Sequence, residues 1–194
     1  FINGNGHLIH RGTSGSMPVQ EFISMGKDAM NPAKQFAAVK KKYDSGIASP
    51  QEMIQYITIR SYSCLKVTDE VAKYLSSQKD EELTNRQNWS VLRDFTNDPN
   101  SREFKYFTSH RAEFEKLYTA DSVSKKTEQV YSSALFEFIR KKEPDMEGYK
   151  KMKEQILALN FPSSEKTILN ADMSLYKKTK DWNNYAKTAT DYID

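Results

Sequence analysis

Apolar side chains recur three or four positions apart along almost the whole chain from Asn31 to the end. Met53, Ile54 and Ile57 show this spacing early in the span, and Ile156 and Leu159 show it late. The spacing places apolar side chains on one face of an α-helix. A short helix cannot bury such a face alone, so successive helices must shield one another from water.

Helix boundary signals divide this span into short segments. Asn31 precedes Pro32, which puts a capping side chain before proline at the first helical position. The segment Ser49-Pro50-Gln51-Glu52 has the spacing of a capping box, and Asp181 is placed to cap a last helix. Helices joined by short links pack antiparallel to their neighbours. The sequence therefore predicts a mainly α fold, an antiparallel helical-hairpin array over residues 31–194.

Aromatic residues make up 12% of the chain and separate into two groups by their spacing. One group falls on the apolar stripes and is predicted to be core: Trp89, Phe104, Phe107, Phe114, Trp182, Tyr185 and Tyr192. A single helix is expected to carry the three phenylalanines, with His110 near its middle. The other group lies off the main stripes and is predicted to form a partner-binding surface: Tyr56, Tyr62, Tyr106, Tyr131 and Tyr176.

Near the carboxyl end, residues 175–186 resemble the middle of a tetratricopeptide unit. A short turn there precedes an aromatic residue, Trp182, and a small residue, Ala186, at a point where helices approach closely. The full signature of about 34 residues does not recur in register. The resemblance therefore implies degenerate, tetratricopeptide-like repeats that would present a protein-binding surface.

The first thirty residues have a different pattern. Residues 1–11 read as strand, turn and strand, because Asn-Gly, which occurs in this segment, is a strong hairpin signal. A helix is predicted from Pro18 to about Met30. The sequence thus predicts two domains, 1–30 with a short β-hairpin and a helix, and 31–194 with helices only.

These first thirty residues resemble the end of a thioredoxin fold, with residues 1–11 as its last hairpin and residues 18–23 in its closing helix. The order of segments is similar to that of secreted thioredoxin-like proteins of Bacteroidetes, which append a helical region. The resemblance implies a periplasmic or secreted location and a parent protein that exchanges thiols and disulfides. The Cys-x-x-Cys motif and the cis-proline of that family precede the matched segment and are absent here. The residues that carry out thiol–disulfide exchange in that family therefore have no counterpart in this chain.

The residues themselves predict no catalytic group, cofactor site or metal site. Cys64 is the single cysteine, so it has no resolving thiol, and its place at a predicted helix end favours a buried, inert state. His7 and His10 lie three apart on a predicted strand, which puts them on opposite faces. The acidic clusters 80–82 and 143–147 are expected in a link and at a helix start.

The distribution of charge along the chain argues against nucleic acid as a partner. The chain has 29 basic and 26 acidic residues, interspersed, for a net charge of +3, and no basic stripe typical of nucleic-acid binding is present. No apolar run approaches the roughly 18 residues of a membrane span.

Three functions stay open from the sequence. The first is a non-catalytic interaction or scaffold region that binds a protein or peptide, or docks the parent's thioredoxin domain. The second is a fragment of a thiol–disulfide oxidoreductase with an upstream Cys-x-x-Cys. The third is an enzyme with a site between helices.

Overall fold

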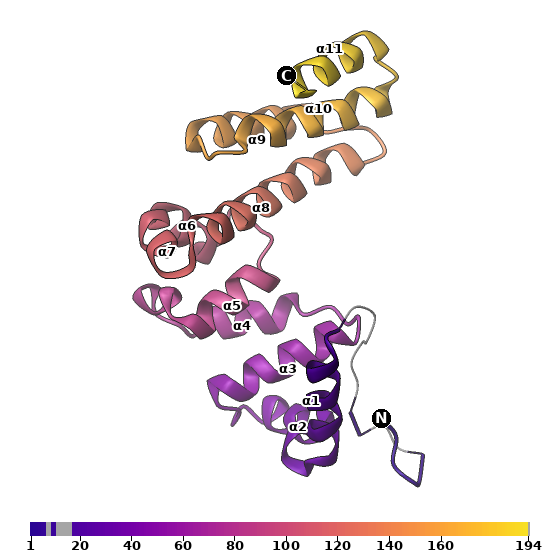
Figure 1. Ribbon diagram of the computed structural model, residues 1–194, viewed down its shortest axis with the longest axis vertical. Coiled ribbons are helices and arrows are strands. Elements are labelled where there is room, and N and C mark those ends of the chain that lie inside the picture. Colours follow the sequence, from indigo (N-terminus) through magenta and orange to yellow (C-terminus); the bar gives the residue numbers. More distant parts are fainter. Residues whose placement is uncertain (7–8, 11–16, 194) are drawn as a thin grey trace. The chain divides into compact units, whose positions relative to one another are not determined.

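A computed structural model describes residues 1–6, 9–10 and 17–193 (Figure 1). Across these residues the chain is mainly helical, with eleven α-helices and two 3-10 helices and no strand. None of the helices in this part of the chain is long and apolar enough to cross a membrane. The chain divides into two compact units, Phe1–Lys79 and Asp80–Asp194.

The amino-terminal residues do not form the predicted β-hairpin within the described part. Asn3 and Gly6 close a turn, in which the Gly6 N–H donates to the Asn3 carbonyl at 2.9 Å, and Gly6 has a φ of +80°. Ile2 is a single bridge residue, and the Phe1 carbonyl accepts from the Ile9 N–H at 3.1 Å. Two short segments without a third strand bury too little to extend such a ladder. Residues 7–8 and 11 of the predicted hairpin lie outside the described residues.

The helix predicted after this turn is confirmed as α1, Val19–Met30. The first unit continues with η1, Pro32–Lys34, and with α2, Phe36–Asp44. Next come α3, Pro50–Tyr62, and α4, Thr68–Ser76. Consecutive helices contact each other, α2 with α3 and α3 with α4.

The predicted caps of the first unit are present. The Asn31 side chain accepts from the Ala33 N–H at 3.0 Å, and it caps η1 rather than an α-helix. The Ser49 N–H donates to the Glu52 carboxylate at 2.9 Å, and the Glu52 N–H donates back to Ser49 Oγ at 3.3 Å. This reciprocal pair satisfies two amides that have no partner inside the helix.

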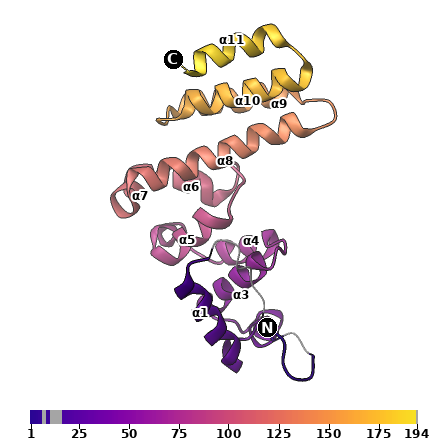
Figure 2. The same ribbon diagram turned by 45° about the vertical axis from the view of Figure 1, so that its right-hand side comes forward.

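The second unit contains eight helices within its described residues. It begins with η2, Asp80–Thr84, then α5, Arg86–Phe95, α6, Arg102–Ser109, and α7, Arg111–Tyr118. It continues with α8, Ala120–Arg140, α9, Met146–Leu159, α10, Ser164–Thr179, and α11, Trp182–Ile193. Helix α8 contacts α7, α9 and α10, and α10 also contacts α9 and α11 (Figure 2).

The single helix predicted around His110 is wrong, because the chain breaks there into α6 and α7. His110 has φ −110° and ψ 24°, outside helical values, and its Nδ1 lies 3.0 Å from the Tyr106 carbonyl. The break brings Phe114 edge-on to Phe107, with ring centroids 5.1 Å apart. Aromatic packing therefore overrides the continuous helical pattern of the sequence.

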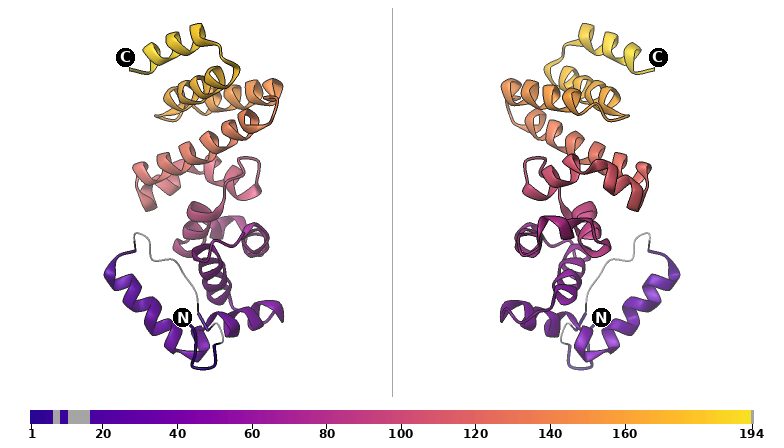
Figure 3. Two further views of the ribbon diagram at one scale, coloured as in Figure 1. Left: turned by 90° about the vertical axis from the view of Figure 1, so that its right-hand side faces the viewer. Right: turned by 90° about the vertical axis from the view of Figure 1, so that its left-hand side faces the viewer.

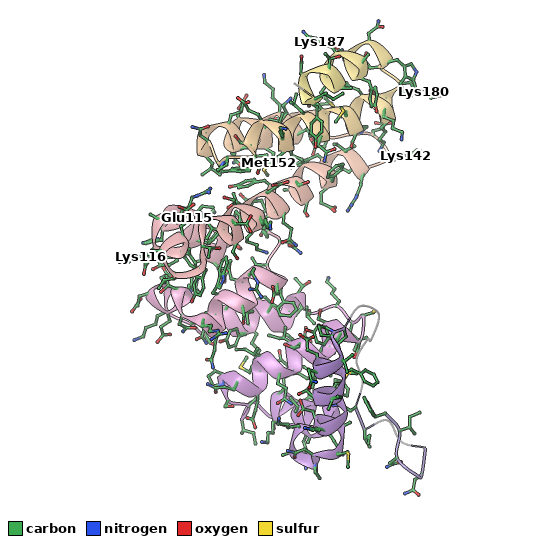
Figure 4. The ribbon with its side chains drawn as sticks, viewed as in Figure 1. Glu115, Lys116, Lys142, Met152, Lys180 and Lys187 are labelled. Carbon is green, nitrogen blue, oxygen red and sulfur yellow. The ribbon has the colours of Figure 1, made fainter. Side chains whose placement is uncertain are left out.

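A cluster of buried apolar residues forms the core of the second unit, and it confirms four of the seven predicted core aromatics. Trp89, Phe104, Phe107 and Phe114 are buried in it, with Leu135 from α8. Met152 of α9 also belongs to this cluster (Figure 4). The prediction is wrong for Trp182, which is 58% exposed, and for Tyr192, which is 37% exposed. Both lie on α11, which packs on α10 and buries Thr188 rather than these two rings. Tyr185 is half-buried and does not belong to the cluster.

The domain boundary predicted at residue 30 falls inside the first unit, in which α1 and η1 are in contact. The division into 1–30 and 31–194 stays a prediction, because it rests on the resemblance of the first segment to another fold.

Candidate functional site

The five tyrosines of the predicted partner surface do not share one exposed surface. Tyr62 is exposed, Tyr106 and Tyr176 are half-buried, and Tyr56 and Tyr131 are buried. Tyr56 and Tyr62 lie in the first unit, and the other three lie in the second. The rings of Tyr56 and Tyr131 are buried and cannot contact a partner in this structure. Of the five, Tyr62 alone is exposed and open to such a contact.

Aromatic contacts explain the burial of Tyr56. Its ring stacks on Tyr43 with centroids 4.5 Å apart and on Phe36 at 6.0 Å, and the Arg60 guanidinium lies over it. Tyr131 is held in the same manner, stacked on Phe161 at 6.0 Å. A residue that lies off the apolar stripe of its own helix can still pack against another helix or loop. The spacing of apolar residues along the sequence does not reveal such a contact.

One side of α1 is an exposed apolar surface of the first unit. Val19, Phe22, Ile23 and Met30 recur at helical spacing and are all exposed, with Val19 at 72% and Met30 at 84%. We call these four residues the outer face of α1. Figure 3 shows α1 at the edge of its unit. Large apolar side chains that gather on one helix face and stay exposed are typical of a surface that contacts another molecule.

The opposite side of α1 borders a cavity of about 310 Å³ within the first unit. Its walls combine apolar side chains, Met25, Ile59 and Tyr62, with polar ones such as Asp28. The volume is within the range of small-molecule sites, about 300–1,000 Å³.

His10 lines this cavity and is buried, with 4% of its surface exposed. Within the described residues, its Nδ1 has no hydrogen-bond partner. Burial lowers the pKa of His10, because the charged imidazolium loses its hydration, while the nearby Asp28 opposes the shift. The shift favours the neutral ring, which offers a nitrogen lone pair or an N–H to the cavity.

A buried polar group joins α9 to α10 in the second unit. The Asp172 carboxylate accepts from Tyr149 Oη at 2.8 Å and from Lys153 Nζ at 2.7 and 2.8 Å. Burial, followed by the Asp172 hydrogen bond, raises the pKa of Tyr149. Each member has its partner, so the group is satisfied and serves to fix two helices rather than to react.

The acidic clusters occupy the positions expected from the sequence. Residues 80–82 begin η2, and Asp145 caps α9 by accepting from the Gly148 N–H at 3.0 Å. The Lys141 ammonium, then this amide, hold the pKa of Asp145 below its usual value. The described residues contain no group of three or more metal-ligating side chains. His7 lies outside the described residues, so the prediction about its side stays untested.

The prediction that Cys64 is buried is wrong. Cys64 is exposed and follows the end of α3 with a φ of +56°, in the left-handed region. The Ser63 and Leu65 N–H groups donate to the Arg60 carbonyl, at 3.0 Å each. The backbone therefore turns sharply at the helix end, and this turn directs the thiol to solvent.

Comparisons of the chain with known protein families, with curated proteins and with solved structures find no match.

Proposed function

We propose that this chain is a non-catalytic helical interaction or scaffold region that binds another protein through the outer face of α1. In this proposal its helices form an antiparallel helical-hairpin array of the tetratricopeptide-like kind. Contacts between consecutive helices, α8 with α9, α9 with α10 and α10 with α11, support such an array. Stacked hairpins present extended surfaces suited to protein partners.

The observation that carries the proposal is the orientation of α1. This helix buries Ala29 toward its own unit, yet its larger apolar side chains, Val19, Phe22, Ile23 and Met30, remain exposed. Burying a side chain of this size stabilises a complex by about 1.5–3 kcal/mol. A helix that keeps four such side chains in water gains most by packing against a second apolar surface.

The resemblance of residues 1–30 to the end of a thioredoxin fold suggests the class of partner. The closing helix of that fold packs on a sheet, so a thioredoxin-like domain would cover the outer face of α1. The same resemblance is the basis for proposing a periplasmic or secreted location and a thiol–disulfide oxidoreductase as the parent protein.

Site-specific photo-cross-linking tests the proposal. A photoreactive amino acid replaces Ile23 on the outer face, and in a matched control it replaces Gln20, which is exposed on the polar side of the same helix. The chain is expressed in its native source and irradiated, and the adducts are identified by mass spectrometry. We expect a thioredoxin-like protein cross-linked from position 23 and not from position 20. Equal yields from both positions, or adducts only between copies of this chain, would contradict the proposal.

An insulin-reduction assay tests the non-catalytic part. Exchange needs a thiolate and a resolving thiol, and this chain has one cysteine, Cys64. We expect the same rate with the Cys64→Ser variant as with the unchanged chain. Turnover that disappears in Cys64→Ser would refute the statement that the chain lacks exchange activity.

A further inference from the structure

The side chain of Lys126 is buried deep in the second unit. Lys126 lies in the second turn of α8 on the same face as Val123 and Val130, and only 2% of its surface is exposed. Its Nζ donates to the Thr96 carbonyl at the carboxyl end of α5. Lysine is almost never fully buried unless its charge is paired.

This ammonium is not paired with a carboxylate. Within the described part of the chain, the Thr96 carbonyl is the sole hydrogen-bond acceptor of Lys126 Nζ, and no ion pair includes it. An ammonium has three N–H donors, so two remain for another acceptor. Thr96 Oγ1 is also buried and without a partner in the same part of the chain. Buried polar groups left in this state are costly, and they indicate that an acceptor belongs nearby.

A cavity of about 400 Å³ opens beside Lys126, and we call it the Lys126 cavity. Arg93 and Asp94 at the end of α5 line it, together with residues from the first turns of α8: Asp121, Ser122, Lys125, Lys126 and Gln129. Three cationic side chains thus face two carboxylates, which leaves an excess of one positive charge. The Ser122 hydroxyl and the Gln129 amide add neutral donors.

The two carboxylates are already engaged with the outer cations. Arg93 Nε lies 2.7 Å from Asp94, and Lys125 Nζ lies 2.8 Å from Asp121. Both pairs are exposed, and exposed pairs contribute little to stability, so an incoming anion can exchange with them. Lys126 is different, because its ammonium is buried and forms no ion pair within the described residues. Burial lowers its pKa to about 8, with Asp94 opposing the shift and Arg93 adding to it.

From this geometry we propose that the Lys126 cavity binds a small oxyanion, a phosphate or carboxylate group, with Lys126 Nζ as the central donor. Arg93, Lys125 and Ser122 would contact the outer oxygens. Charge-assisted hydrogen bonds of this kind are the strong ones, and an oxyanion provides enough acceptor sites for both free N–H groups of Lys126. The proposal is independent of the protein-binding surface on α1, which lies in the other unit.

Titration of the whole chain with inorganic phosphate, and separately with acetate, tests the proposal by calorimetry at pH 7 and constant ionic strength. The Lys126→Met variant removes the central donor. Lys116→Met is the matched control, since Lys116 is an exposed lysine on α7 (Figure 4). We expect affinity for at least one anion to fall about tenfold or more in Lys126→Met, and to stay unchanged in Lys116→Met. The anion that binds more tightly identifies which oxyanion class the cavity prefers.

A second measurement uses the unchanged protein, so it does not depend on the folding of the variant. Carbon-detected NMR of labelled lysines follows the titration of the buried Lys126 amine. A bound oxyanion favours the charged amine, so saturating anion should raise its pKa by about one unit or more. No anion-dependent rise, or anion binding of equal affinity in Lys126→Met, would overturn the proposal.

Discussion

The buried amine of Lys126 should make the stability of the second unit increase with pH above neutrality. Its pKa is lowered from 10.5 to about 8 in the folded protein, whereas the unfolded chain keeps the ordinary value. Between these two values the unfolded state binds more protons than the folded state, so raising the pH favours folding. The full effect of a shift of roughly 2.5 units is about 3 kcal/mol.

Somewhat less than half of this effect lies in an accessible pH range. Applying the two pKa values at each pH gives a gain of about 1.3 kcal/mol between pH 7 and pH 9. The rise in stability with pH should end before pH 10. Burial raises the pKa of Tyr131, and a raised tyrosine pKa lowers the stability of the folded state as the pH rises. A tyrosine that stays protonated when folded but ionises when unfolded makes stability fall as the pH rises through its unfolded pKa.

Urea unfolding followed by tryptophan fluorescence measures the effect. Both tryptophans, Trp89 and Trp182, belong to the second unit, so the signal reports on that unit. We expect the pH-dependent gain in the unchanged protein and in Lys116→Met, and its loss in Lys126→Met. If the free energy of unfolding stays flat between pH 7 and pH 9, or if Lys126→Met keeps the same slope, Lys126 is not a desolvated ammonium.

Three further predictions concern stability. A Cβ on Gly148 would lie 2.7 Å from Cδ1 of Phe138, so Gly148→Ala should lower the unfolding free energy by about 1–3 kcal/mol in urea denaturation. Gly26→Ala is the control, because a Cβ at Gly26 would have no atom within 4 Å. Equal losses of unfolding free energy in the two variants would show that α8 and α9 are less close than described. Asp172→Ala removes the shared acceptor of the buried Tyr149 hydroxyl and the half-buried Lys153 ammonium and should cost about 1–3 kcal/mol by the same assay, so no measurable loss would contradict the described contacts. Ser49→Ala removes a helix cap and should cost about 1 kcal/mol in thermal unfolding, and no change would contradict the capping box.

The local signals in the sequence were sufficient where neighbouring residues decide the structure. The capping box of Ser49 and Glu52 is present, as is the cap from Asp181, which accepts from the Asn184 N–H at 3.2 Å. The prediction of helices throughout the chain after Asn31 is confirmed in outline, with a break at His110. These features depend on contacts between residues at most four positions apart, which a linear pattern contains.

The candidate site could be found only in part. Tyr62 was predicted to be at a contact surface, and it borders the cavity beneath α1. The exposure of the outer face of α1 could not be predicted, because spacing alone does not tell which side of a helix meets the core. The burial of Lys126 was not predicted, although the sequence indicates it. A lysine on the same helical face as Val123 and Val130 places a charge on an apolar stripe, which is unusual.

Local sequence patterns were enough to predict that this protein is mainly helical and where some of its helices begin. Contacts between distant parts of the chain bury Tyr56 and Tyr131, and the packing of the helices leaves Trp182 and the Cys64 thiol exposed. Helical periodicity and capping depend on residues within one turn of each other. Burial depends instead on which other helix lies opposite each residue, and that contact joins positions far apart in the chain.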